Sequence, residues 1–79
     1  MEIIVLGAGC AKCEKVYSTV EKVIAEAGIK ATLRKEEDIM KIMSYDVMTT
    51  PAVVVNGEVK FKGYVPTEAE VKKALGIHS

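Results

Sequence analysis

The sequence predicts an α/β fold with a mixed four-stranded sheet and helices on both faces, in the order strand, helix, strand, helix, strand, strand, helix. Three observations lead to this prediction. A short apolar segment at the start ends at glycines, apolar residues then recur at helical spacing, and the turn signal Asn56-Gly57 separates an apolar run from an alternating one. A crossover through a helix joins parallel strands and a tight turn joins antiparallel ones, so the sheet must be mixed.

The first part of the chain is predicted to form a strand, a long helix and a second strand. Glu2 to Leu6 is apolar after its first residue and is stopped by Gly7-Ala8-Gly9. From Ala11 a helix is predicted that ends at Gly28. Its core-facing positions include Val16, Val20 and Val23. Residues 31–35 alternate between apolar and polar, and their basic side chains suit an edge strand.

A second helix is predicted to start at residues 36–38, where three acidic side chains favour a helix N-terminus. Ile39, Ile42 and Met43 are expected on one side of this helix. Met40, Met43 and Met48 are expected to fill the core, because methionine is flexible enough to occupy irregular gaps between other apolar side chains.

The last part of the chain is predicted to form a hairpin and a helix. Ala52 to Val55 is a continuous apolar run that suits a strand buried on both faces. After Asn56-Gly57, residues 58–62 alternate and should pair with that run in antiparallel fashion. Thr67 with Glu70 three residues later forms a capping box, which predicts the start of the final helix.

Length and charge restrict the possible functions. The 79 residues predict a single domain over residues 1–79. Eleven Lys and Arg balance eleven Asp and Glu, so no positive field attracts nucleic acid or anionic lipid. No apolar run approaches the roughly 20 residues that span a membrane, and the first residues lack a basic leader region. We therefore expect a cytoplasmic monomer that binds neither nucleic acid nor membrane.

Cys10 and Cys13 are the only cysteines, and they lie three positions apart at the start of the predicted long helix. A bridge over two intervening residues closes almost no loop, so redox exchange or metal binding explains the pair better than structural stapling or two unrelated cysteines. The helix N-terminus lowers the pKa of a thiol, which makes Cys10 the predicted nucleophile and Cys13 the resolving thiol. Lys12 adds a nearby positive charge that would favour the thiolate, although a lysine in a first turn is commonly only solvated.

The Gly-Cys-x-x-Cys motif after the first strand, Thr50-Pro51 before the third, and the ending from Gly63 to Leu75 resemble a known family. It comprises the very small, glutaredoxin-sized members of the thioredoxin superfamily from archaea and bacteria, often called small redox-active disulfide proteins. The resemblance covers essentially the whole chain and implies a thioredoxin-like fold that exchanges dithiol and disulfide with protein substrates, without a cofactor. It also implies that Thr50-Pro51 is cis and faces Cys10 and Cys13, and that the preceding segment pairs with substrate backbone.

Several differences limit what this resemblance implies. Gly9, Ala11 and Lys12 stand where thioredoxins have Trp before the first cysteine and Gly-Pro between the two. No carboxylate interrupts Ile3 to Leu6, where thioredoxin has a buried acid. Gly63-Tyr64 stands where glutaredoxins use a Gly-Gly pair to bind glutathione. We therefore expect a thioredoxin-reductase-like electron donor in preference to glutathione.

The main alternative is a carrier of Cu(I) or another soft metal, which a pair of thiolates can bind. Small copper-carrying domains resemble Met-x-Cys-x-x-Cys and end on a strand, whereas position 8 is Ala and the last predicted element is a helix. A structural zinc site needs four ligands, and the chain adds only His78, which we expect to be solvated. A dinucleotide site is disfavoured because Lys12 replaces the third glycine of the fingerprint.

Overall fold

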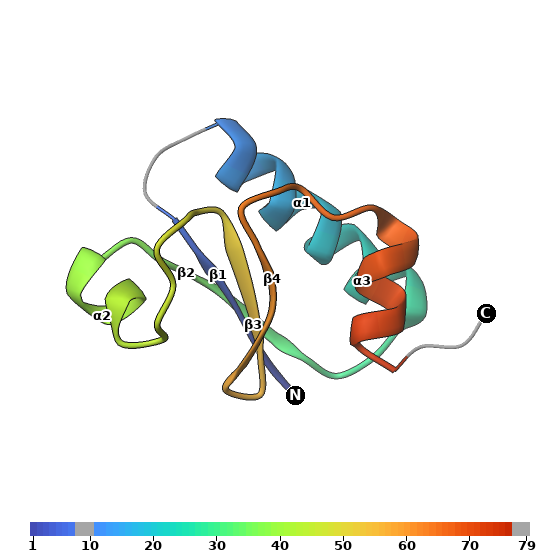
Figure 1. The fold of residues 1–79 in the computed structure, drawn as a ribbon. Coiled ribbons are helices and arrows are strands. Elements are labelled where there is room, and N and C mark those ends of the chain that lie inside the picture. Colours follow the sequence, from blue (N-terminus) through green and yellow to red (C-terminus); the bar gives the residue numbers. More distant parts are fainter. Residues whose placement is uncertain (8–10, 77–79) are drawn as a thin grey trace.

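Four strands form one mixed sheet in the order β2-β1-β3-β4 (Figure 1). The computed structural model describes residues 1–7 and 11–76, so the predicted positions of Cys10 and His78 lie outside the described residues. The elements are β1 (Glu2–Leu6), α1 (Ala11–Ala27), β2 (Thr32–Glu36), α2 (Ile39–Met43), β3 (Ala52–Val55), β4 (Glu58–Lys62) and α3 (Glu68–Ala74). Their order is the predicted one, and the architecture is thioredoxin-like.

The strand pairings follow from the connections between the strands. β1 and β2 are parallel, because α1 returns the chain to the end of the sheet from which β1 started. β3 is antiparallel to both β1 and β4, and its register with β1 ends at the pair Leu6 and Ala52. Asn56 and Gly57 join β3 to β4 with φ of 49° and 83°, as a type I′ hairpin turn requires. β1 and β3 are therefore neighbours in the sheet, although they lie far apart in the sequence.

Helices cover both faces of the sheet, as predicted. α1 and α3 pack together on one face, and α2 lies on the other (Figure 1). The buried residues of the first face are Ile3, Val5, Val16, Val20, Val23, Val53, Val55, Val71 and Leu75. Those of the second face are Ile4, Leu6, Ile42, Val47, Ala52 and Val54. Because both faces are covered, all four residues of β3 are buried, which confirms the prediction for its apolar run.

The structure corrects the prediction for the second helix and its methionines. α2 begins only after Asp38, whose carboxylate accepts a hydrogen bond from Met40 N, and Glu36 belongs to β2. Ile42 is buried, but Ile39 and Met43 are exposed. Met40, Met43 and Met48 are 76, 55 and 89% exposed, so the prediction that they fill the core is wrong. A helix of five residues makes little more than one turn, so few of its side chains can face the sheet.

The final helix is capped as the sequence predicts. Thr67 Oγ1 accepts a hydrogen bond from Glu70 N, and a Glu70 carboxylate oxygen accepts one from Thr67 N at 3.0 Å. The reciprocal pair satisfies two of the amides that a helix leaves without internal partners. Within the described ranges, no helix combines the length and the apolar character needed to cross a membrane.

Candidate functional site

The end of β1 and the first turn of α1 meet at the side chain of Cys13. Cys13 is the third residue of α1 and is only 5% exposed. Gly7 follows β1 with a φ of 154°, and a Cβ atom built on it would overlap Cys13 Sγ. The sulfur therefore packs directly on the Gly7 backbone, an approach that only glycine permits at this conformation.

Thr50 approaches the same place from a distant part of the chain. The Cβ position of Gly7 lies 3.7 Å from Thr50 Cβ, so the Thr50 side chain and the Cys13 sulfur approach the same point beside Gly7. Thr50 is exposed and precedes β3, beyond the last residue pair of the β1–β3 register. The Thr50-Pro51 peptide bond is cis, which confirms that prediction. Its position relative to Cys10 lies outside the described residues.

Pro51 is buried between the site and the loop that follows β4. Its carbonyl oxygen accepts a hydrogen bond of 2.8 Å from Gly63 N. A Cβ atom on Gly63 would lie 3.2 Å from Thr49 Oγ1, so this loop packs closely on the segment that leads into Pro51. The neighbouring Tyr64 is partly exposed and donates a hydrogen bond of 3.0 Å to Glu70.

The ionisable groups near this loop shift each other's pKa. Partial burial, and then the hydrogen bond and charge of Glu70, raise the pKa of Tyr64. The backbone hydrogen bond from Thr67, and then the one from the Tyr64 hydroxyl, lower the pKa of Glu70. Both shifts favour the pair as it stands at neutral pH, with a protonated phenol donating to an ionised carboxylate.

Lys12 lies on the outer side of the first turn of α1. It is exposed and lines a shallow depression with Ala11, Glu14, Lys15 and Ser18. Its ammonium group is therefore in contact with solvent, while Cys13 on the adjacent position is directed into the protein. This arrangement agrees with the solvated alternative considered for Lys12.

Among the described residues, no polar or charged side chain is buried, and no group of three potential metal-ligating side chains comes together. The buried stretch Ile3 to Leu6 beside Cys13 is entirely apolar. Proton transfer to or from Cys13 therefore has no buried carboxylate to assist it within the described part of the chain.

The contact between Gly7 and Cys13 in this site is not predicted from the sequence. Gly7 and Gly9 are predicted to end the first strand and to let the turn expose Cys10, whereas a glycine directly between a strand and a Cys-x-x-Cys segment also indicates a close backbone approach. Met43, on the five-residue α2, and Met48, which follows that helix, are predicted to lie in the core but are exposed, because apolar spacing over so short a segment cannot distinguish a buried face from a surface one.

A thioredoxin-like sheet, a nearly buried cysteine at the start of α1 and a cis-proline entering β3 together define a thioredoxin-like redox protein. Comparison with known proteins agrees with this class. A family model described as "Thioredoxin domain" matches residues 1–76, and the chain belongs to this family. A protein named "Thioredoxin" from Methanocaldococcus jannaschii is 36% identical over 71 residues, which cover 90% of this chain and 81% of the relative. Another protein named "Thioredoxin", from Methanothermobacter thermautotrophicus, is 32% identical over 75 residues, which cover 95% of this chain and 97% of the relative.

Proposed function

We propose that the chain is a thiol-disulfide oxidoreductase that exchanges a Cys10-Cys13 dithiol for the disulfide of a protein substrate. One observation carries the proposal: the Cys13 sulfur, Gly7 and Thr50 meet at the start of α1 in a chain of the thioredoxin family. A helix N-terminus favours thiolate over thiol, and the thiolate is the species that attacks a disulfide.

The exchange transfers two electrons in two steps. The Cys10 thiolate attacks one sulfur of the substrate disulfide, and the other substrate sulfur leaves as a thiolate that takes up a proton. The Cys13 thiol loses its proton and attacks the Cys10 sulfur of the mixed disulfide. The Cys10-Cys13 disulfide forms and the second substrate thiolate leaves, so the substrate is reduced and the protein is oxidised. Burial of Cys13 supports its assignment to the second, intramolecular step.

Thr50 and Pro51 form the substrate-facing turn in this proposal. Pro51 has no amide hydrogen, and the exposed backbone of Thr50 lies beyond the β1–β3 register. An extended substrate segment would pair with that backbone as an added strand, which presents its disulfide to Cys10.

The remaining assignments follow from the proposed chemistry. A dithiol that acts as a reductant must be re-reduced, and a thioredoxin-reductase-like enzyme is the proposed electron donor. Such a cycle requires a reducing compartment, so we place the protein in the cytoplasm, acting as a monomer without a cofactor. Lys12 has a secondary role in stabilising the thiolate through its charge.

Two cysteine variants test the proposal. The wild-type protein should form an intramolecular disulfide on mild oxidation, seen by mass spectrometry as the loss of two protons and reversed by dithiothreitol. Cys13→Ser should accumulate a mixed disulfide with a disulfide-containing protein such as insulin, because the resolving thiol is missing. Cys10→Ser should neither trap nor reduce the substrate. Full substrate reduction by Cys10→Ser would contradict the proposal.

The same reduced protein tests the copper-carrier alternative. We expect a strong Cu(I) chelator to remove copper from the two thiolates, because soft metals bind such pairs adventitiously. The order of elements also differs from that of small copper-carrying domains, since α3 is the last element of the described residues. One copper retained per chain against the chelator, together with absent disulfide exchange, would replace the oxidoreductase proposal with the carrier.

A further inference from the structure

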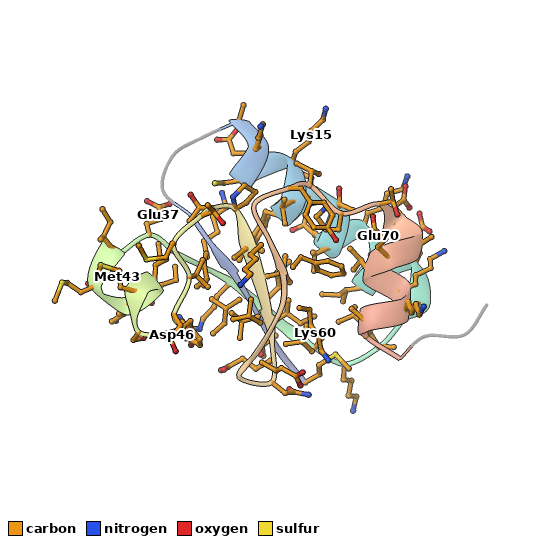
Figure 2. All side chains as sticks on the ribbon, viewed as in Figure 1. Lys15, Glu37, Met43, Asp46, Lys60 and Glu70 are labelled. Carbon is orange, nitrogen blue, oxygen red and sulfur yellow. The ribbon has the colours of Figure 1, made fainter. Side chains whose placement is uncertain are left out.

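Exposed apolar side chains gather around α2 and the segment that leads to Pro51. Ile39 is 65% exposed, and the methionines at positions 43 and 48 are also exposed. Met43 is 55% exposed and lies on α2, where Figure 2 labels it. Together these side chains form one wall and the rim of a cavity of about 330 Å³, the α2 groove. Its lining residues are Ile39, Ile42, Met43, Val47, Met48 and Thr50.

The α2 groove begins at the candidate redox site. Thr50 lines the groove, and its Cβ is also the atom 3.7 Å from the Cβ position of Gly7, on which Cys13 packs. A chain segment that pairs with Thr50 would therefore extend one of its side chains directly into the groove. Exposed apolar surface of this kind marks a site of protein contact, and methionines suit a surface that accommodates different side chains.

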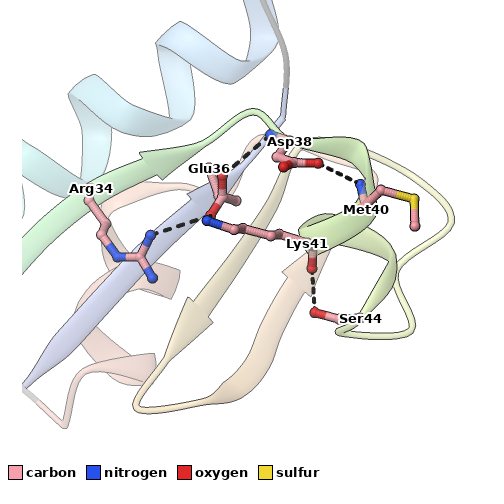
Figure 3. A network of polar contacts seen from close by, with 6 residues as sticks. All are labelled: Arg34, Glu36, Asp38, Met40, Lys41 and Ser44. Carbon is pink, nitrogen blue, oxygen red and sulfur yellow. Dashed lines mark hydrogen bonds and ion pairs between the residues drawn. The ribbon is translucent and has the colours of Figure 1, made fainter.

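The wall of the groove that α2 provides is held in place by a polar network (Figure 3). The Glu36 carboxylate pairs with Arg34 at 3.5 Å and with Lys41 at 3.9 Å, and accepts a hydrogen bond from Asp38 N at 3.3 Å. Asp38 in turn caps α2 through Met40 N at 2.9 Å. These contacts connect α2 to the end of β2.

Two carboxylates, Glu37 and Asp46, lie within two residues of the groove-lining residues Ile39 and Val47, in a chain that is neutral as a whole. Glu37 and Asp46 are exposed, and Figure 2 shows them on opposite sides of α2. Within the described ranges neither carboxylate forms an ion pair, whereas Arg34 and Lys41 both pair with Glu36. Two carboxylates that flank an apolar cavity are complementary to an apolar side chain with basic neighbours.

We propose that the α2 groove docks an extended segment of the protein substrate that carries a large apolar side chain flanked by Lys or Arg. This inference rests on the proposed oxidoreductase function and specifies its substrate class. The apolar side chain occupies the cavity between Met43 and Met48, the basic neighbours face Glu37 and Asp46, and the segment backbone continues to Thr50.

Three synthetic disulfide-containing peptides test the preference. The peptides differ only at one central residue and its two neighbours. These three positions hold leucine between lysines, leucine between glutamates, or serine between lysines. The measurement is the second-order rate constant for their reduction by the pre-reduced protein, with neutral bis(2-hydroxyethyl) disulfide as a probe too small to fill the groove. At low ionic strength the lysine-flanked leucine peptide should react about tenfold faster than either of the others. Its advantage over the glutamate peptide should shrink at high salt.

Surface variants assign the preference to the groove. The double substitution Met43→Gln and Met48→Gln should remove the advantage of leucine over serine and leave reduction of the small disulfide unchanged. Met40→Gln is the matched control, because Met40 is also largely exposed and lies on α2 beside Met43 but does not line the cavity. Glu37→Gln with Asp46→Asn should remove the preference for lysine over glutamate, while Glu21→Gln on α1 should not. Circular dichroism confirms that each variant is folded.

The outcomes separate the two proposals. If wild-type protein fails to reduce bis(2-hydroxyethyl) disulfide and all peptides, the oxidoreductase function and the docking proposal are both wrong. If it reduces the small disulfide but treats the three peptides alike, or if Met40→Gln acts like the double variant, only the docking proposal is overturned. Self-association in sedimentation equilibrium that the Met43 and Met48 substitutions abolish would instead assign the groove to a second copy of this chain.

Discussion

A Cβ atom on Gly7 would overlap the Sγ atom of Cys13, so the sulfur rests directly on the backbone at the end of β1. The φ of Gly7, 154°, is also one that side-chain-bearing residues rarely adopt. The two facts together make position 7 a determinant of where the Cys13 sulfur sits.

Gly7→Ala should therefore lower both stability and exchange activity. Strained backbone and overlap with Cys13 should reduce the free energy of unfolding by about 1–3 kcal/mol. Displacement of the sulfur should also lengthen the lifetime of the mixed disulfide with substrate, measured by quenched-flow alkylation. Gly57→Ala is the matched control: its φ is 83°, and its added Cβ meets no atom within 4 Å. It should cost about 1–2 kcal/mol and leave the lifetime unchanged. Equal lifetimes in the two variants would disprove the positioning role of Gly7.

Leu6→Ala and Met48→Ala should differ sharply in chemical denaturation. Leu6 is fully buried between the sheet and α2, so its truncation leaves a cavity and should cost about 2–5 kcal/mol of unfolding free energy. Met48 is 89% exposed, so its truncation should change that free energy by less than about 0.5 kcal/mol. A large loss of unfolding free energy in Met48→Ala would indicate that this side chain is part of the core, as the sequence alone predicts.

The two cysteines should differ in reactivity. Cys13 is 5% exposed, whereas Cys10 precedes α1. With limiting iodoacetamide the reduced protein should be alkylated first at Cys10, as mapped by peptide mass spectrometry, because reaction requires an accessible thiolate. Repeating the labelling in denaturant, where both thiols are exposed, provides the control. Faster labelling of Cys13 in the folded protein would reverse the assigned roles.

The capping box of α3 should make stability depend on pH in the acidic range. The pKa of Glu70 is lowered in the folded protein, first by the hydrogen bond from Thr67 N, from an ordinary value of 4.5. Its ionised form is therefore favoured by folding, and the resulting stability is present above pH 4.5 and is lost as the pH falls through the folded-state pKa. Glu70→Gln should reduce this acidic dependence, measured by thermal unfolding between pH 7 and pH 3. Glu26→Gln, at an exposed position of α1, should retain it.

Local patterns were sufficient for most of the fold because each is a property of a short segment. Alternation and apolar runs located every strand, Asn56-Gly57 located the hairpin, and Thr67 with Glu70 located the start of α3. The boundary of α2 was less accurate, since acidic residues favour a helix start without specifying which residue caps it. Asp38 takes that role because Glu36 still pairs with Leu6 as part of β2.

The sequence by itself determined the class of protein: the order of elements, the sheet they can build, and a Cys-x-x-Cys segment at a helix start. Only the tertiary structure decided that Gly7 carries the Cys13 sulfur, that Thr50 comes beside it, and that Met43 and Met48 face solvent beside Thr50. The physical reason is that helix and strand periods and caps depend on residues a few positions apart. Contact between residues 7 and 50, and the exposure of one side of α2, depend instead on how β1 and β3 pair and on how much of the sheet α2 covers.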